Sequence, residues 1–83
     1  MEIITTLDKL EVNQKATVTD IKLSGAIYNR LLDIGLVKGT VIECVGKSPL
    51  GDPSAYIIRG AVMALRCEES AKIIIMVAAG DVT

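Results

Sequence analysis

Hydrophobic and polar positions show their clearest period between Ser24 and Gly35. Apolar side chains recur there at the spacing of one helix face, at Ile27, Tyr28, Leu31, Leu32 and Ile34. This spacing predicts a helix, with Ser24 suited to cap its first turn and Gly35 suited to end it. Since a helix of about three turns is marginal alone in water, we expect it to pack on a sheet.

Strand-like runs, rich in β-branched residues and bounded by turn formers, cover much of the remaining chain. They span residues 16–21, 40–45, 54–59, 62–66 and 72–77. The last run, KIIIMV, is apolar on both faces and is therefore expected at the centre of the sheet. Asn13 is expected in a turn with a left-handed backbone, 60–61 in a tight turn, and 68–71 in a single helical turn. The pattern favours a mainly β fold, with five short strands in a small closed or partly closed barrel.

Length and composition limit the number of domains, the size of the core and the kinds of function that such a fold can have. The 83 residues suit one domain, 1–83, with an ordered core of about 5–78 and a C-terminal tail that frays. At this size about 60% of the surface can be buried, which supports one small core. A nucleotide-hydrolysing fold needs a larger sheet with helices on both faces. We therefore expect no enzyme of that kind.

Charges are balanced and scattered, with nine Lys or Arg against ten Asp or Glu. A nucleic-acid-binding surface needs a basic stripe and stacking aromatics, whereas this chain has two Tyr and no Phe or Trp. No apolar run approaches the roughly 20 residues that span a membrane, and the N-terminus lacks the features of a signal peptide. We expect a cytoplasmic protein that neither binds nucleic acid nor inserts in the membrane.

Reactive side chains are scarce, because the chain has no His and only two Cys. Catalysis would have to rest on carboxylates or thiols. Cys44 and Cys67 form no CxxC motif, and we expect both to be reduced thiols that behave as small apolar residues. Cys67 with Glu68 and Glu69 forms a locally dense set of metal-ligand types, although two adjacent acids mostly indicate a solvated turn. We expect neither a bound metal nor a cofactor.

The run Gly46-Lys47-Ser48 repeats the end of a nucleotide-binding phosphate loop, G-x-x-x-x-G-K-[ST]. Val41 stands where the first Gly of that motif belongs. The motif must also open a helix, whereas Pro49 and Pro53 follow closely here. The match is a coincidence of three letters.

The segment 48–53, SPLGDP, is instead expected to form a rigid hairpin loop. Its two prolines restrict the backbone, Gly51 can adopt a positive φ, and Asp52 can bond nearby backbone. Leu50 is the one large apolar residue of the loop. It either folds back onto the core or points outward, and the sequence leaves both orientations open.

Four segments in this order resemble the ferrous iron transport protein A family (FeoA-like). They are RLLDIGLVKGT (30–40), SPLGDP (48–53), IIRG (57–60) and MALR (63–66). The resemblance covers residues 7–77, and its departures, Asn13 in place of a frequent Gly and the tail beyond Val77, touch none of these segments. It implies an SH3-like β-barrel in a small bacterial cytoplasmic protein that is not an enzyme.

The resemblance further implies an accessory or regulatory role in ferrous iron uptake. The expected partner is a membrane Fe²⁺ transporter, contacted at its cytoplasmic G-protein domain or an adjoining region. We expect docking through the loop tip and the outer face of the helix, at Leu50, Gly51, Asp52, Asn29, Arg30 and Asp33. Arg30 can give a bidentate contact to a carboxylate, or it can be a solvated helix residue.

Other roles stay open from the sequence. An inserted arginine can speed GTP hydrolysis, and Arg59 or Arg66 could supply one, although Arg in a small barrel more often pairs with carboxylates. The chain could also be a generic SH3-like adaptor, or a metal-responsive regulatory module that binds another protein. A barrel edge could pair with another copy and produce a homo-oligomer.

Overall fold

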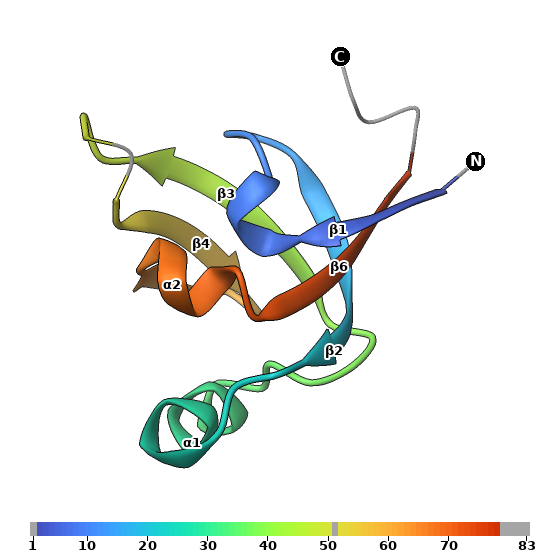
Figure 1. Ribbon diagram of the computed structural model, residues 1–83, viewed down its shortest axis with the longest axis vertical. Coiled ribbons are helices and arrows are strands. Elements are labelled where there is room, and N and C mark those ends of the chain that lie inside the picture. The colour runs from blue at the N-terminus through green and yellow to red at the C-terminus, as the bar shows by residue number, and fades with distance from the viewer. Residues whose placement is uncertain (1, 51, 79–83) are drawn as a thin grey trace.

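The computed structural model describes residues 2–50 and 52–78. In this part of the chain six strands form one antiparallel sheet, in the order β1-β6-β2-β3-β4-β5 (Figure 1). The elements are β1 (Glu2–Thr6), the 3₁₀ helix η1 (Leu7–Lys9), β2 (Lys15–Ile21), α1 (Gly25–Asp33), β3 (Val41–Lys47), β4 (Ser54–Ile58), β5 (Ala61–Leu65), α2 (Cys67–Ser70) and β6 (Ile73–Ala78). The mainly β prediction is confirmed, together with one short helix and a single helical turn. The predicted C-terminal fraying beyond residue 78 concerns residues outside the described part.

Strand β1 corrects the predicted number of strands from five to six. Its sequence, EIITT, shows no alternation of apolar and polar residues. The strand exists through its antiparallel pairing with β6, which runs from Glu2 opposite Ala78 to Thr6 opposite Ile74. A partner this far along the chain leaves no local signal in the sequence. The same pairing places β6 between β1 and β2, which agrees with the inner position predicted for it.

Two register shifts allow the sheet to coil around its core. The register of β2 against β6 shifts between Val18 and Asp20, and that of β3 against β4 shifts between Cys44 and Gly46. Such bulges bend a strand and increase its twist. In Figure 1 the strands β2 and β3 curve across the molecule and join the two halves of the sheet.

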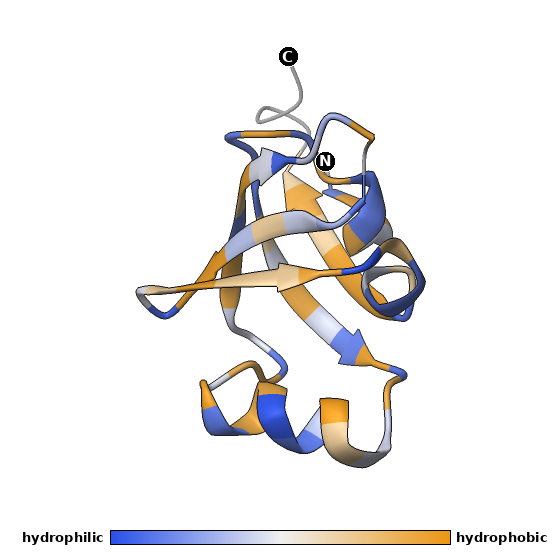
Figure 2. Cartoon of the chain, turned by 90° about the vertical axis from the view of Figure 1, so that its left-hand side faces the viewer, coloured by the Kyte–Doolittle hydropathy of each residue, from blue (hydrophilic) through white to orange (hydrophobic). Residues whose placement is uncertain are grey.

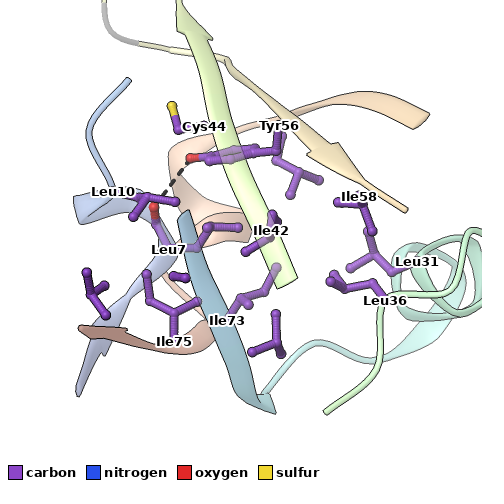
Figure 3. Close-up of a cluster of buried hydrophobic side chains, with 14 residues drawn as sticks. Leu7, Leu10, Leu31, Leu36, Ile42, Cys44, Tyr56, Ile58, Ile73 and Ile75 are labelled. Carbon is purple, nitrogen blue, oxygen red and sulfur yellow. Dashed lines mark hydrogen bonds between the residues drawn. The ribbon is translucent and has the colours of Figure 1, made fainter. Parts of the chain in front are cut away.

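The buried side chains gather in one cluster inside the coiled sheet (Figure 3). They are Leu7, Leu10, Ala16, Val18, Leu31, Leu36, Ile42, Cys44, Tyr56, Ile58, Leu65, Ile73, Ile75 and Val77. Tyr56 is the largest of the fully buried side chains, and its hydroxyl donates a hydrogen bond to the carbonyl oxygen of Leu7 at 3.4 Å. Burial raises the pKa of Tyr56. The cluster therefore joins η1, α1 and the strands β2 to β6 in a single core.

Helix α1 ends as its sequence predicts. Gly35 has a φ of +92°, its N–H donates to Leu32 O at 3.0 Å, and the N–H of Leu36 donates to Leu31 O at 2.9 Å. These two bonds make a Schellman motif, in which a glycine ends the helix and an apolar pair closes the turn. Leu31 and Leu36 are that pair, and both are fully buried.

The beginning and the position of α1 differ from the prediction. Ser24 holds the N-cap position with an extended backbone, but its side chain makes no cap hydrogen bond. Figures 1 and 2 show α1 beyond one end of the sheet, not lying across a face. The helix packs Leu31, with half-buried Ile27 and Ile34, against the end of the core.

Candidate docking surfaces

The described residues 48–50, 52 and 53 between β3 and β4, together with α2, form a surface that we call the loop end. Its most prominent member is Leu50, whose side chain is 94% exposed. Of the two orientations that the sequence leaves open, the structure therefore shows the outward one. The N–H of Ser48 donates to Pro53 O at 3.1 Å and holds the two sides of the loop together. Gly51, also predicted to take part in docking, lies outside the described residues.

Asp52 ties the loop to α2. One of its carboxylate oxygens, Oδ1, accepts the N–H of Cys67 at 3.0 Å. The sequence suggested a bond to nearby backbone within the loop, whereas the partner lies fifteen residues further on. Cys67 is the first residue of α2, so the carboxylate meets an N–H group that has no acceptor within the helix. The exposed Leu50 is thus presented by a loop fixed at its base.

The adjacent acidic residues Glu68 and Glu69 belong to the first turn of α2. Glu69 accepts the N–H of Arg66 at 2.9 Å through Oε1, and Glu68 is exposed. No three His, Cys, Asp or Glu side chains among the described residues gather into a group that could hold a metal ion. Cys67, Glu68 and Glu69 are therefore neighbours in sequence without convergent ligand geometry.

The two thiols differ in environment. Cys44 is fully buried in the core, as predicted, and burial raises the pKa of its thiol. Cys67 is exposed, which corrects the prediction that it would behave as a small apolar residue. Cys67 and Glu68, the first two residues of α2, both lie at the surface.

Helix α1 and the turn 34–40 form the opposite surface, which we call the helix end. Asn29, Arg30 and Asp33 are all exposed there, as their position on the outer face of α1 predicts. Figures 1 and 2 place α1 and the β3–β4 loop at opposite ends of the molecule, along an axis of 34 Å. The two groups of predicted docking residues therefore belong to two separate surfaces.

A groove at the helix end was not predicted from the sequence. It has a volume of about 480 Å³ and lies between α1 and β2, lined by Asp20, Ile21, Tyr28, Leu32, Val37 and Lys38. Leu32 and Val37 are 39% and 43% exposed. The helical pattern assigns Leu32 to the buried stripe, and only the placement of α1 at the end of the sheet leaves it facing the groove.

Charged side chains on the groove's rim largely neutralise one another. Asp20 forms ion pairs with Lys22 at 2.8 Å and with Lys38 at 3.9 Å. The hydrogen bond from Lys22, supported by the N–H of Ile21, lowers the pKa of Asp20. The same pair raises the pKa of Lys22. The rim therefore offers little unpaired charge to a ligand.

Arg59 joins the β4–β5 turn to the helix end. The turn consists of Arg59 and Gly60, with φ values of +50° and +85°, so it begins one residue earlier than the predicted turn at 60–61. A positive φ is unusual for Arg. Its side chain lies over Gly35, where Nε would be 3.0 Å from an added Cβ. Arg59 thus packs the turn after α1 against the hairpin. The disfavoured alternative of an inserted catalytic arginine, at Arg59 or Arg66, stays open.

Comparisons with known proteins agree with this architecture. The model of the FeoA domain family matches residues 5–77. The solution structure of the FeoA protein from Chlorobium tepidum has a TM-score of 0.85 and 32% identity, over 93% of this chain and 73% of that one. The crystal structure of Stenotrophomonas maltophilia FeoA with zinc, a prokaryotic SH3 domain protein, has a TM-score of 0.75 and 28% identity, over 93% of each chain. These similarities confirm the SH3-like fold and the resemblance seen in the sequence.

A longer relative contains a matching segment. The Fe(2+) transport protein A/Fe(2+) transporter FeoB fusion protein of Porphyromonas gingivalis is 34% identical over 67 residues. These residues are 81% of this chain but only 8% of that protein. In the part of this chain that the structure describes, no helix has the length and apolar character needed to cross a membrane.

Proposed function

Because the chain belongs to the FeoA domain family, we propose that it is a non-enzymatic accessory protein of bacterial ferrous iron uptake. It acts in the cytoplasm, where it docks on the cytoplasmic part of a membrane Fe²⁺ transporter, at the G-protein domain or the region adjoining it. Docking requires no reactive side chain, and the chain has no His that could act as a general base.

One observation carries the proposal. In the fusion protein of P. gingivalis, a segment related to this chain and an Fe²⁺ transporter are parts of the same polypeptide. Covalent linkage holds two modules at a high effective concentration and makes even a weak contact between them persist. Where no linker joins the two modules, the contact has to rest on the docking surface alone.

We assign the first contact to the loop end. Leu50 is an apolar side chain in water, so covering it with a partner is favourable. The bond between Asp52 and Cys67 already fixes the base of the loop, which reduces the entropy that binding must remove. The predicted contact includes Gly51, beside Leu50 in the sequence.

The helix end supplies a second, independent candidate contact. Arg30 and its neighbours Asn29 and Asp33 are exposed on α1, which lies at the far end of the molecule (Figure 1). A partner that used both surfaces would have to span the long axis of 34 Å. Replacing Arg30 by Glu would weaken binding only if the transporter reaches that far.

Calorimetric titration of the chain with the transporter's cytoplasmic part tests the proposal. We expect Leu50→Asp to weaken binding at least about tenfold, because a charge would be buried in an apolar contact. Ile4→Asp is the matched control, since it introduces the same change at a large apolar residue that is 60% exposed on β1, outside both surfaces. Unchanged affinity for Leu50→Asp, with its fold verified by circular dichroism, would refute the loop-end contact.

A further inference from the structure

Strand β5 leaves one edge of the sheet open. It stands at the end of the strand order and pairs only with β4 among the described strands. The two-residue turn makes Ile58 and Ala61 a hydrogen-bonded pair, and such pairs alternate along an antiparallel ladder. Met63 and Leu65 consequently bond to β4, whereas the N–H and C=O groups of Val62 and Ala64 point away from it.

The open edge carries none of the usual protection against pairing with another chain. Natural edge strands are blunted by charged residues, proline, bulges or a covering element. The sequence of β5, AVMAL, contains no charge and no proline, and its register against β4 has no bulge. Val62 is 67% exposed, and Ala64 is exposed as well.

We propose that β5 pairs antiparallel with β5 of a second copy of this chain, about a two-fold axis at Met63. This register sets Val62 opposite Ala64 of the other copy, and Ala64 opposite its Val62. Each of these two pairs exchanges two backbone hydrogen bonds, so four bonds join the two sheets. The inference is independent of the proposed function.

The occupant follows from the strand's own symmetry. A two-fold axis requires a surface that complements itself. The residues on either side of Met63 are small or β-branched and uncharged, so the pairing sets no like charges opposite one another within the strand. At each end the register brings Arg59 of one copy to the start of α2 of the other, whose first turn carries the acidic residues Glu68 and Glu69.

The dimer is expected to be weak and reversible. A five-residue edge buries less than the roughly 1,200 Å² of a standard stable interface. Dimer and monomer therefore exchange with concentration, and Leu50, which lies in the connection between β3 and β4, takes no part in the pairing.

Sedimentation velocity and amide hydrogen exchange of the full chain test this pairing. We expect the sedimentation coefficient to rise with concentration toward about 1 mM. Over the same range the amides of Val62 and Ala64 gain protection, while those of Met63 and Leu65 are protected throughout by β4. A chain that stays monomeric, or a dimer without new protection at Val62 and Ala64, overturns the proposal.

Two variants and a control locate the contact. Ala64→Pro removes an outward N–H, a position at which edge strands accept proline, and should raise the dimer dissociation constant at least about tenfold. Val62→Lys should do the same by placing like charges near each other across the axis. Val41→Lys changes another valine, 56% exposed, on the inner strand β3, and should leave dimerisation unchanged.

If both edge variants dimerise like the natural chain, or the control weakens the dimer equally, the assignment to β5 is wrong. Protection of Val62 and Ala64 that arises only on adding the transporter's cytoplasmic part would contradict self-pairing. It would assign the edge to an extended segment of that partner instead.

Discussion

The loop end and the helix end are built by opposite means. At the loop end a short backbone segment is held by two hydrogen bonds, and its largest apolar side chain, Leu50, stands in water. At the helix end the apolar residues Leu31 and Leu36 are fully buried. The outer face of α1 carries the polar residues Asn29, Arg30 and Asp33, and Leu32 beside the groove is 39% exposed. The contrast shows that α1 contributes to the core, and it supports the proposal that the loop makes the first contact with the partner.

Further contacts at the helix end serve the fold. The hydroxyl of Thr40 donates to Gly35 O at 3.0 Å and accepts the N–H of Val37 at 3.1 Å, which fixes the turn after α1. Arg59 packs over the same glycine. Perturbing these residues should therefore cost stability, while perturbing Leu50 should cost binding.

The largest effect on folding is expected for Leu31→Ala. Truncating a fully buried leucine should lower the free energy of unfolding by about 2–5 kcal/mol. Leu50→Ala, the same truncation at the loop end, should change the free energy of unfolding by less than about 0.5 kcal/mol, the usual limit for substitutions at the surface. Urea unfolding followed by circular dichroism measures both, and equal losses would remove the distinction between the two ends.

Gly35→Ala should have the next largest effect. The added Cβ meets a φ of +92° and the side chain of Arg59, and backbone strain alone costs about 1–3 kcal/mol. Gly39→Ala is a close control, since Gly39 has the same φ of +92° and no neighbour within 4 Å of an added Cβ.

The difference between the stability losses of Gly35→Ala and Gly39→Ala isolates the contact of the added Cβ with Arg59. It should shrink when Arg59→Ala is added to Gly35→Ala. A double variant no more stable than Gly35→Ala alone would show that Arg59 does not press on this turn.

A smaller effect is expected at the base of the loop. Asp52→Ala removes the acceptor for the N–H of Cys67 and should cost about 1 kcal/mol, the usual range for a lost helix cap. Hydrogen exchange of the Cys67 amide should accelerate. Asp52→Asn keeps a side-chain acceptor and should retain most of the protection, so an identical response of the two variants would argue against the bond.

The smallest effect concerns the ion pair on the groove's rim. Because the pKa of Asp20 is lowered in the folded chain, its contribution to stability is present above the unfolded value of 3.8 and disappears as the pH falls through the lower, folded value. Lys22, whose pKa is raised, contributes below 10.5 and loses its contribution as the pH rises beyond that.

Both groups are solvated, so the change in melting temperature should be slight and should diminish at high salt. Asp20→Asn should flatten the acid limb of the melting curve measured against pH. An acid limb of unchanged steepness would show that other carboxylates dominate it.

Local signals in the sequence explain most of what was predicted correctly. Asn13 has the expected left-handed backbone, with a φ of +72°, and Gly35 ends α1 because only the glycine tolerates that turn. Gly46 and Lys47 lie within β3 and not before a helix, in agreement with the rejection of a phosphate loop.

What the sequence did not reveal depends on distant contacts. Strand β1 needs β6 as a partner, and Arg59 adopts a positive φ while packing on a helix that is remote in sequence. The separation of Asn29, Arg30 and Asp33 from Leu50 and Asp52 likewise follows from how α1 is placed at the end of the sheet (Figure 1). Their assignment as docking residues stays a prediction for both surfaces.

The most direct test of the central claim follows the amide signals of the isotope-labelled chain by NMR while the transporter's cytoplasmic part is added. We expect shifts or broadening to concentrate at residues 48–53 and on the neighbouring turn of α2, with the amides of α1 unchanged. Perturbations confined to α1 and its groove, or none at saturating partner concentration, would contradict docking through the loop end.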